Sequence, residues 1–168
     1  MALLSDDETA RLRALLEAEL VADVTLVHYT RRGGETAGGG ETAGGGEAAG
    51  GGEAAGAGDC PSCADTEPLL HELCATSGHL NLEVHDLGSE PEIARRAGID
   101  MVPAVVVKGP GARGAVRLFG LPAGYEFASL IGDVIDIGAG RDELSPETHS
   151  VLEALPRDVH LRVFVTPT

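Results

Sequence analysis

The sequence has 168 residues, only 3% of them aromatic, and is long enough for one domain whose core consists of aliphatic side chains. Its net charge of −15, from 27 acidic and 12 basic residues, excludes nucleic acid and anionic membrane surfaces as expected partners. The sequence contains no secretory signal, no stretch as long as a membrane span and only three cysteines, so we expect a cytoplasmic protein.

The first predicted elements are a helix and a strand. A capping-box pattern begins at Ser5, and leucines on one helical face predict a helix over residues 6–20. The apolar run Val24–Thr30 predicts a strand. Residues 33–58 then repeat a Glu-Thr-Ala-Gly-Gly-Gly unit or its Ala variant, and half of them are glycine. Such a segment predicts a disordered loop, interpreted either as a flexible flap beside the following cysteines or as an insertion without function.

Two of the three cysteines begin the next predicted element. Cys60-Pro61-Ser62-Cys63 opens an apolar pattern of helical spacing, which predicts a helix ending near Gly78. Unpaired N–H groups and the dipole at a helix start favour a thiolate over a thiol, so a strand followed by this motif and a helix indicates a redox dithiol. We expect Cys60, nearest the helix start and more exposed, to be the attacking thiolate and Cys63 to resolve the mixed disulfide.

Other uses of these cysteines are a zinc site and a packing role. Zinc would require Cys60, Cys63, His71 and Cys74 as ligands. In one helix Cys74 lies ~16 Å along the axis from Cys63, whereas each ligand must lie within ~2.3 Å of the metal. No metal site is therefore predicted, and Cys74 is interpreted as a buried structural cysteine. A dithiol with only a packing role remains an alternative.

The rest of the chain alternates strands and helices. The predicted elements are a strand over 80–86, a short helix after Ser89 that ends at Gly98, a strand over 102–107, its hairpin partner over 115–119, a helix over 125–135 with Tyr125 and Phe127 as core anchors, a helix starting at Ser145, and a strand over 160–166. A strand–helix–strand start implies a right-handed parallel crossover, and the hairpin adds antiparallel pairing. We therefore expect a three-layer α/β/α fold with a mixed central sheet and an extra N-terminal helix.

Three groups of residues carry a resemblance to a known family. They are Cys60-Pro61-Ser62-Cys63 after a strand, Met101-Val102-Pro103 before a strand, and the run Phe-Gly-Leu-Pro-Ala-Gly-Tyr-Glu-Phe at residues 119–127. Together they resemble the glutaredoxin-like protein disulfide oxidoreductases of archaea and bacteria, over nearly the whole chain except residues 33–58. The resemblance implies a thioredoxin-like domain over 1–140. That family has two such units in tandem, so residues 141–168 are expected to be a connector helix and the first strand of a missing second unit.

The resemblance also implies roles for individual residues. A cis peptide bond is implied before Pro103, beside the dithiol, leaving the main-chain groups of Val102 free to pair with an extended substrate. From the residues alone, an ordinary proline at the start of a strand is an equal alternative. Pro61, Ser62, Val102 and Pro103 are thus candidate substrate-binding residues. The implied partners are protein disulfide substrates and a flavin-dependent thioredoxin reductase.

The preferred hypothesis is a thiol–disulfide oxidoreductase that needs no bound cofactor, because Cys60 and Cys63 themselves carry two electrons. A glutathione-dependent role has less support, since no basic cluster is present to bind the glutathione carboxylates. The alternative from a different class is a non-catalytic interaction or scaffold domain left from a longer two-unit enzyme. An apolar strand over 160–166 could also pair with a second copy of the chain, which would give a homo-oligomer.

Overall fold

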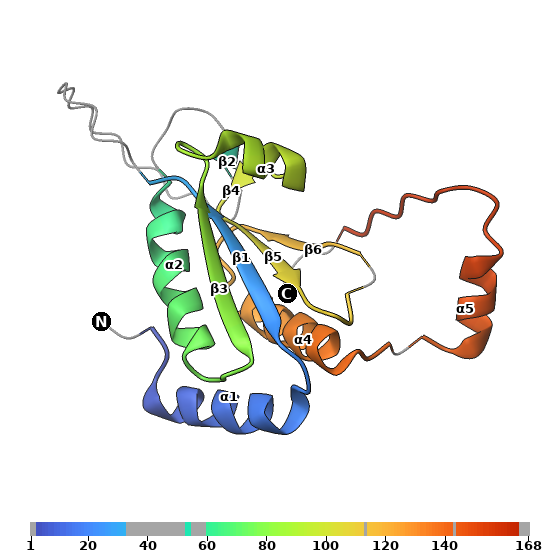
Figure 1. Ribbon diagram of the computed structural model, residues 1–168, viewed down its shortest axis with the longest axis horizontal. Coiled ribbons are helices and arrows are strands. Elements are labelled where there is room, and N and C mark those ends of the chain that lie inside the picture. The colour runs from blue at the N-terminus through green and yellow to red at the C-terminus, as the bar shows by residue number, and fades with distance from the viewer. Residues whose placement is uncertain (1–2, 33–52, 55–59, 113, 143, 165–168) are drawn as a thin grey trace.

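The computed structural model describes residues 3–32, 53–54, 60–112, 114–142 and 144–164 (Figure 1). The elements in chain order are α1 (Asp6–Glu19), β1 (Val24–Thr30), β2 (Glu53–Ala54), α2 (Pro61–Cys74), β3 (Leu80–Asp86), α3 (Pro91–Ala97), β4 (Met101–Val102), β5 (Ala104–Lys108), β6 (Val116–Phe119), α4 (Tyr125–Ala139) and α5 (Pro146–Glu153). Within the described ranges, the helices are too short or too polar to cross a lipid bilayer.

The central sheet is mixed, as predicted. Its four strands lie in the order β3-β1-β5-β6. β1 and β3 run parallel, with Thr30 opposite Asp86, and α2 forms the crossover between them. β5 runs antiparallel to both of its neighbours, so Ala104 lies opposite Tyr29 on one side and opposite Phe119 on the other.

Helices cover both faces of the sheet, which gives the predicted three layers (Figure 1). On one face, α1, α2 and α4 pack against β1 and β5 through a large aliphatic core. Fully buried members of this core include Leu16, Leu26, Leu70, Val105 and Val134. Successive strand residues point to opposite faces, so Val27 and Tyr29 lie in a second cluster, together with Ala94 of α3 and both Cys60 and Cys63.

The first helix begins with the predicted capping box. The Glu8 N–H donates to Ser5 Oγ at 3.3 Å, and the Ser5 N–H donates to Glu8 Oε2 at 2.8 Å. These two bonds satisfy N–H groups that have no partner within the helix. Of the predicted apolar face, Leu16 is fully buried, whereas Leu15 is 42% exposed.

The predicted end of α2 is wrong. The helix ends at Cys74, four residues before Gly78, with Ala75 as its C-cap residue. Beyond this end the Thr76 N–H and hydroxyl both donate to the Leu73 carbonyl, three residues back, at 3.0 Å and 2.7 Å. Glycine ends α3 instead, as predicted, at Gly98 with φ of 69°. The predicted strand over 102–107 is also divided into β4 and β5 at Pro103, which has no N–H to donate to a sheet.

Tyr125 was expected to anchor the core but is 81% exposed. It is the first residue of α4, and two helical steps of 100° place its side chain about 160° away from that of Phe127. Phe127 is partly buried and packs against the large aliphatic core, as do the buried Leu130 and Ile131 that follow it. The direction of the side chains around the helix therefore places Phe127 against the core and Tyr125 in solvent.

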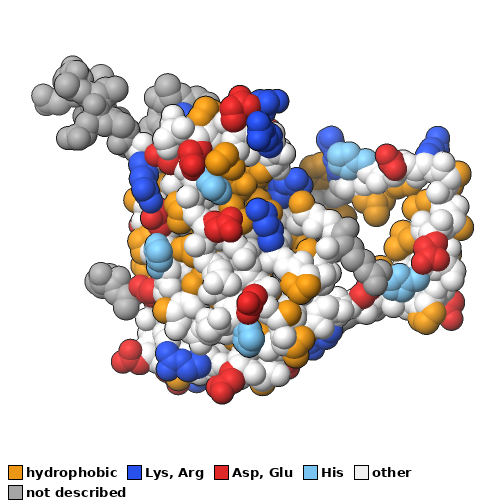
Figure 2. All heavy atoms as spheres, viewed as in Figure 1, with side chains coloured by type: hydrophobic (Ala, Val, Ile, Leu, Met, Phe, Trp, Pro, Cys, Tyr) orange, Lys and Arg blue, Asp and Glu red, His pale blue; other side chains and the backbone are white. Residues whose placement is uncertain are grey.

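The segment after α4 stands away from the body of the protein (Figures 1 and 2). Ser145 caps α5 as predicted, accepting a hydrogen bond from the Thr148 N–H at 3.2 Å, but α5 buries none of its residues. The predicted strand is wrong over residues 160–164, which form no strand and include Phe164 at 89% exposure. This segment pairs with none of the described strands. Residues 165–166 of the prediction lie outside the described residues.

Of the glycine-rich segment 33–58, the structure describes only Glu53 and Ala54. They form β2, which pairs antiparallel with β4, so the prediction of a loop throughout is wrong for these two residues. The rest of the segment lies outside the described residues. The division into residues 1–140 and 141–168 remains a prediction.

Candidate functional site

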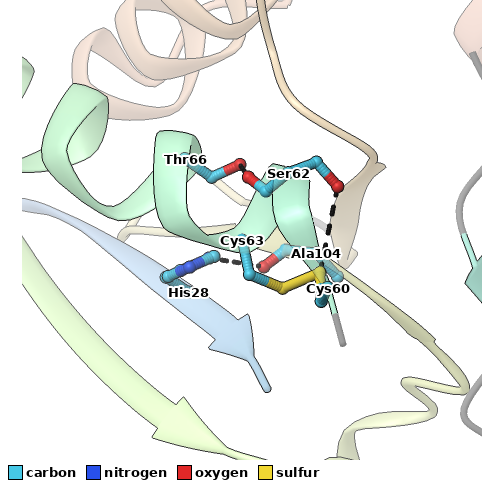
Figure 3. The surroundings of a disulfide bond; sticks show 6 residues. All are labelled: His28, Cys60, Ser62, Cys63, Thr66 and Ala104. Carbon is cyan, nitrogen blue, oxygen red and sulfur yellow. Dashed lines mark hydrogen bonds between the residues drawn. A yellow bond between two sulfur atoms is a disulfide. The ribbon is translucent and has the colours of Figure 1, made fainter. Parts of the chain in front are cut away.

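Cys60 and Cys63 are joined by a disulfide bond at the start of α2 (Figure 3). Cys60 is the N-cap residue of the helix, and the Cα atoms of the two cysteines lie 5.3 Å apart. Pro61 occupies the first helical position, where its missing N–H removes no hydrogen bond. The two sulfur atoms thus lie where the unpaired N–H groups and the positive end of the helix dipole stabilise negative charge.

Both cysteines are more buried than the sequence suggested. Cys60 is 8% exposed and Cys63 is 3% exposed. Cys60 is the more accessible of the two, as predicted, but the expectation of an exposed sulfur is wrong for the disulfide form. Side chains that share an apolar cluster with the disulfide, including Val27, Val102 and Ala104, surround the pair.

A cavity of about 200 Å³ gives access to the disulfide from the end of β1 and the first turns of α2. Its described lining consists of Thr30, Arg31, Arg32, Cys60, Pro61, Cys63, Ala64 and Glu67. Arg32 and Glu67 form an ion pair at 2.8 Å. The cavity therefore carries charged groups of both signs beside the disulfide.

Hydrogen bonds hold the first turn of α2 in place (Figure 3). The Thr66 hydroxyl donates to the Ser62 carbonyl at 2.7 Å, and the Ser62 hydroxyl lies 3.8 Å from Cys60 Sγ. A hydroxyl at this position can donate to a Cys60 thiolate and so stabilise it. Thr66 was not among the predicted site residues, although a threonine four residues after Ser62 is the spacing at which a hydroxyl reaches back to a helix carbonyl.

The peptide bond between Val102 and Pro103 is cis, as the resemblance implied. Both residues are buried, and Val102 lies in the same apolar cluster as the two cysteines. The Pro103 carbonyl accepts a hydrogen bond from the Gly120 N–H at 2.8 Å, which ties the start of the 119–127 run to this point. The main chain of Val102 is not free, however, because it pairs with Glu53 of β2.

His28 on β1 is a buried polar residue that was not among the predicted site residues. Its Nδ1 lies 3.3 Å from the Ala104 carbonyl oxygen, which can only accept, so Nδ1 carries the proton (Figure 3). Its Nε2 has no hydrogen-bond partner among the described residues. Burial lowers the pKa of His28, and the hydrogen bond to Ala104 opposes this effect. The signal available in the sequence was a histidine at a core-facing position between Leu26 and Thr30.

The described residues contain no group of three or more His, Cys, Asp or Glu side chains that could hold a metal ion. Cys63 and Cys74, two of the residues considered for zinc, lie at opposite ends of α2. Cys74 is half-buried, and burial raises the pKa of its thiol to about 11. A zinc site requires thiolates, so this environment disfavours Cys74 as a ligand.

Comparison with known proteins identifies the fold. No protein-family model and no curated protein matches the sequence. Among solved structures, a protein disulfide oxidoreductase from Aeropyrum pernix K1 matches with 23% identity and a TM-score of 0.66, over 90% of this chain and 55% of that chain. The alkylhydroperoxide reductase protein AhpF of Enterococcus faecalis matches with 20% identity and a TM-score of 0.63, over 91% of this chain and 61% of that chain.

The chain spans between 55% and 61% of the length of these two solved structures. At this level of identity the likeness concerns the fold alone. The four-stranded mixed sheet, the helices on both faces and the Cys60–Cys63 disulfide at the start of α2 agree with that likeness. The chain therefore has a thioredoxin-like fold that carries a Cys-x-x-Cys disulfide.

Proposed function

We propose that the chain is a thiol–disulfide oxidoreductase that exchanges two electrons with disulfides of other proteins. The observation that supports this most directly is the Cys60–Cys63 disulfide at the start of α2, in contact with an apolar cluster that includes Val102. The pair can exist as a disulfide within this fold, and a reduced pair supplies two electrons without a bound cofactor.

In the reducing direction, the Cys60 thiolate attacks one sulfur of a substrate disulfide. A mixed disulfide forms between Cys60 and the substrate, and the other substrate sulfur leaves as a thiolate. The Cys63 thiolate then attacks Cys60 Sγ and releases the second substrate sulfur as a thiolate. The substrate has gained two electrons, its two thiolates take up protons, and the chain returns to the Cys60–Cys63 disulfide. The same steps in reverse oxidise a substrate dithiol.

Cys60 is the proposed attacking residue because it is the helix N-cap, lines the cavity and is more exposed than Cys63. Cys63, 3% exposed, is proposed to react with Cys60 Sγ, the atom to which it is bonded in the disulfide. Pro61 lines the same cavity, and the Ser62 hydroxyl lies near Cys60 Sγ, which supports a role for both in contacting substrate. Val102 and Pro103 are proposed to contact an extended substrate segment, which would pair with the main chain of Val102 in place of Glu53.

We propose the cytoplasm as the location, and a flavin-dependent thioredoxin reductase as the enzyme that returns the disulfide to the dithiol. The likeness to a protein named as part of an alkylhydroperoxide reductase supports a reductase partner. Residues 160–164 carry exposed apolar side chains such as Leu161 and Val163. Their pairing with a second copy, or with a second thioredoxin-like unit, is part of the same proposal.

Insulin reduction by dithiothreitol tests the activity. The wild-type chain should accelerate the reaction, and Cys60→Ser should abolish the acceleration. Cys74→Ser is the matched control, because it removes the remaining cysteine at the far end of α2 and should leave the rate unchanged. Absence of acceleration by the wild type, or full activity of Cys60→Ser, would overturn the proposal and support the scaffold alternative.

A further inference from the structure

The main chain of β4 is already paired with another segment of the same chain. β2 lies antiparallel to β4, with Glu53 opposite Val102 and Ala54 opposite Met101 (Figure 1). These two strands form a separate sheet, so β2 has no pairing partner other than β4 among the described residues. In the sequence, β2 precedes Cys60 closely and belongs to the last of the glycine-rich repeats.

We propose that β2 is an internal competitor of the substrate. In the proposed function, on which this inference rests, an extended substrate segment pairs with the main chain of Val102. One side of a strand can pair with only one extended segment at a time. A protein substrate that pairs with this side of β4 must therefore displace Glu53 and Ala54, and β2 acts as an autoinhibitory segment.

The covalent connection of β2 to the rest of the chain favours its contact with β4, and the short length of β2 weakens that contact. A segment on the same chain reaches its site at an effective concentration of about millimolar, which allows even a short strand to compete. β2 has only two residues, so few main-chain hydrogen bonds hold it against β4. A substrate segment with larger side chains and a longer pairing region can therefore displace β2.

The cavity at the disulfide gives small molecules a different route. Its described lining comes from the end of β1 and from residues 60–67, and none of it belongs to β2 or β4. A small disulfide can thus reach Cys60 without pairing to Val102. The inference predicts that β2 discriminates between substrates: it slows reactions of proteins that bind in an extended form and leaves small disulfides unaffected.

A double substitution, Glu53→Pro with Ala54→Pro, removes the contact. Successive N–H groups of a strand point to opposite sides, so replacing both residues removes whichever N–H donates to β4. The repeat supplies a matched control, Glu47→Pro with Ala48→Pro, which makes the same change in the preceding Glu-Ala-Ala-Gly unit. Both variants are made in the full chain, and both are assayed with insulin and with a small aromatic disulfide.

We expect the 53/54 variant to lower KM for insulin by about 3- to 10-fold, because apparent affinity rises as the competent fraction rises from roughly 0.1–0.3 towards 1. Reduction of the small disulfide should stay within about twofold of wild type, as should both reactions of the 47/48 control. An unchanged KM for insulin overturns the inference. An equal gain in the control overturns the assignment to Glu53 and Ala54, and an equal gain with the small disulfide overturns the proposed discrimination.

Hydrogen exchange separates this inference from the proposed function, because it requires no activity. The amides of Met101 and Val102 are compared in the wild type and in the 53/54 variant, both in the disulfide form. Loss of the β2 contact should speed exchange of at least one of the two amides, and the 47/48 control should match wild type. Equal protection in all three proteins would overturn the contact itself. An inactive chain that shows the expected exchange would overturn the oxidoreductase and retain the contact.

Discussion

The protein should lose unfolding free energy as the pH falls below neutral, and replacing His28 by leucine should make this loss smaller. The ring is fully buried, Nδ1 donates to the Ala104 carbonyl, and Nε2 has no hydrogen-bond partner in the described part of the chain. A second proton would place a charged donor at Nε2 in an apolar environment. Burial accordingly lowers the pKa of His28, the Ala104 hydrogen bond and Glu67 raise it, and Arg32 and His71 lower it.

The sign and size of the effect follow from proton binding. The unfolded chain protonates His28 near its ordinary pKa of about 6.5, whereas the folded chain does so only at lower pH. The contribution of the neutral ring to stability is therefore complete above about pH 6.5 and is lost as the pH falls towards the folded-state value. If the folded ring stays neutral, the loss between about pH 7.5 and pH 5.5 reaches its limit of about 1.4 kcal/mol.

Urea unfolding of wild type and His28→Leu at these two pH values measures the difference. We expect the wild type to lose up to about 1.4 kcal/mol more unfolding free energy than the variant. The two proteins share all other titrating groups, including the ion pairs of His79 with Asp23 and of His85 with Glu90, so the background cancels. An equal loss in both proteins would refute the reasoning, because the His28 ring would then not be held neutral in the native state.

One reaction and three substitutions test the burial of side chains and the helix caps. Burial raises the pKa of Cys74 to about 11 from 9.0, so its alkylation at about pH 8 should be roughly 100-fold slower in the folded chain than in urea; equal rates would contradict this. Ser5→Ala should lower the unfolding free energy by about 1 kcal/mol, whereas Ser145→Ala, which caps a helix without buried residues, should lower it by less than about 0.5 kcal/mol. Leu70→Ala should cost about 2–5 kcal/mol in urea unfolding, and a cost below about 1 kcal/mol would show that Leu70 is not a core residue.

Elements that are specified by residues close together in the sequence were predicted correctly. The capping box at Ser5, the alternation of β3 and the glycine at position 98 each act within a few residues, and the structure contains the helix start, strand and helix end that they specify. The mixed sheet was predicted for a similar reason. A crossover helix requires parallel neighbours and a short turn requires antiparallel ones, so the order of elements determines the direction of the strands.

The incorrect predictions concern features that depend on contacts distant in sequence. A strand over residues 160–164 needs a neighbouring strand, and this segment pairs with none of the described strands, although β3 and β6 each have an unpaired edge. Gly78 matches the usual residue type at a helix end, but α2 ends four residues earlier, with Ala75 as its C-cap residue. The pairing of β2 with β4 joins residues about fifty positions apart, within a repeat whose units are nearly identical, so no local pattern distinguishes Glu53 from its counterparts.

The same limit applies to the candidate site. Spacing alone located Cys60 and Cys63 at a helix start, because the motif and the helix it opens are continuous in sequence. Their apolar cluster includes side chains from β1, β4 and β5. The sheet register brings β1 and β5 together, and the cis peptide bond before Pro103 joins β4 to β5. His28 was missed for this reason as well: its carbonyl partner, Ala104, lies on the antiparallel neighbour of β1.

Because Cys60 is buried, we expect its reactivity to depend more on whether a reactant can reach Cys60 Sγ than on the intrinsic chemistry of the cysteine pair. A thiol or a disulfide must reach Cys60 Sγ through the cavity beside α2 or by moving the apolar cluster that covers the pair. Any thiolate donor can reduce an exposed disulfide, whereas an 8% exposed cysteine reacts only with molecules that fit this opening or bind well enough to widen it. Substrate choice then depends on the shape of the cavity and on the occupancy of β4. Substitutions in β2, which is not part of the described lining of this cavity, should change the selectivity of the proposed oxidoreductase more than its reduction potential.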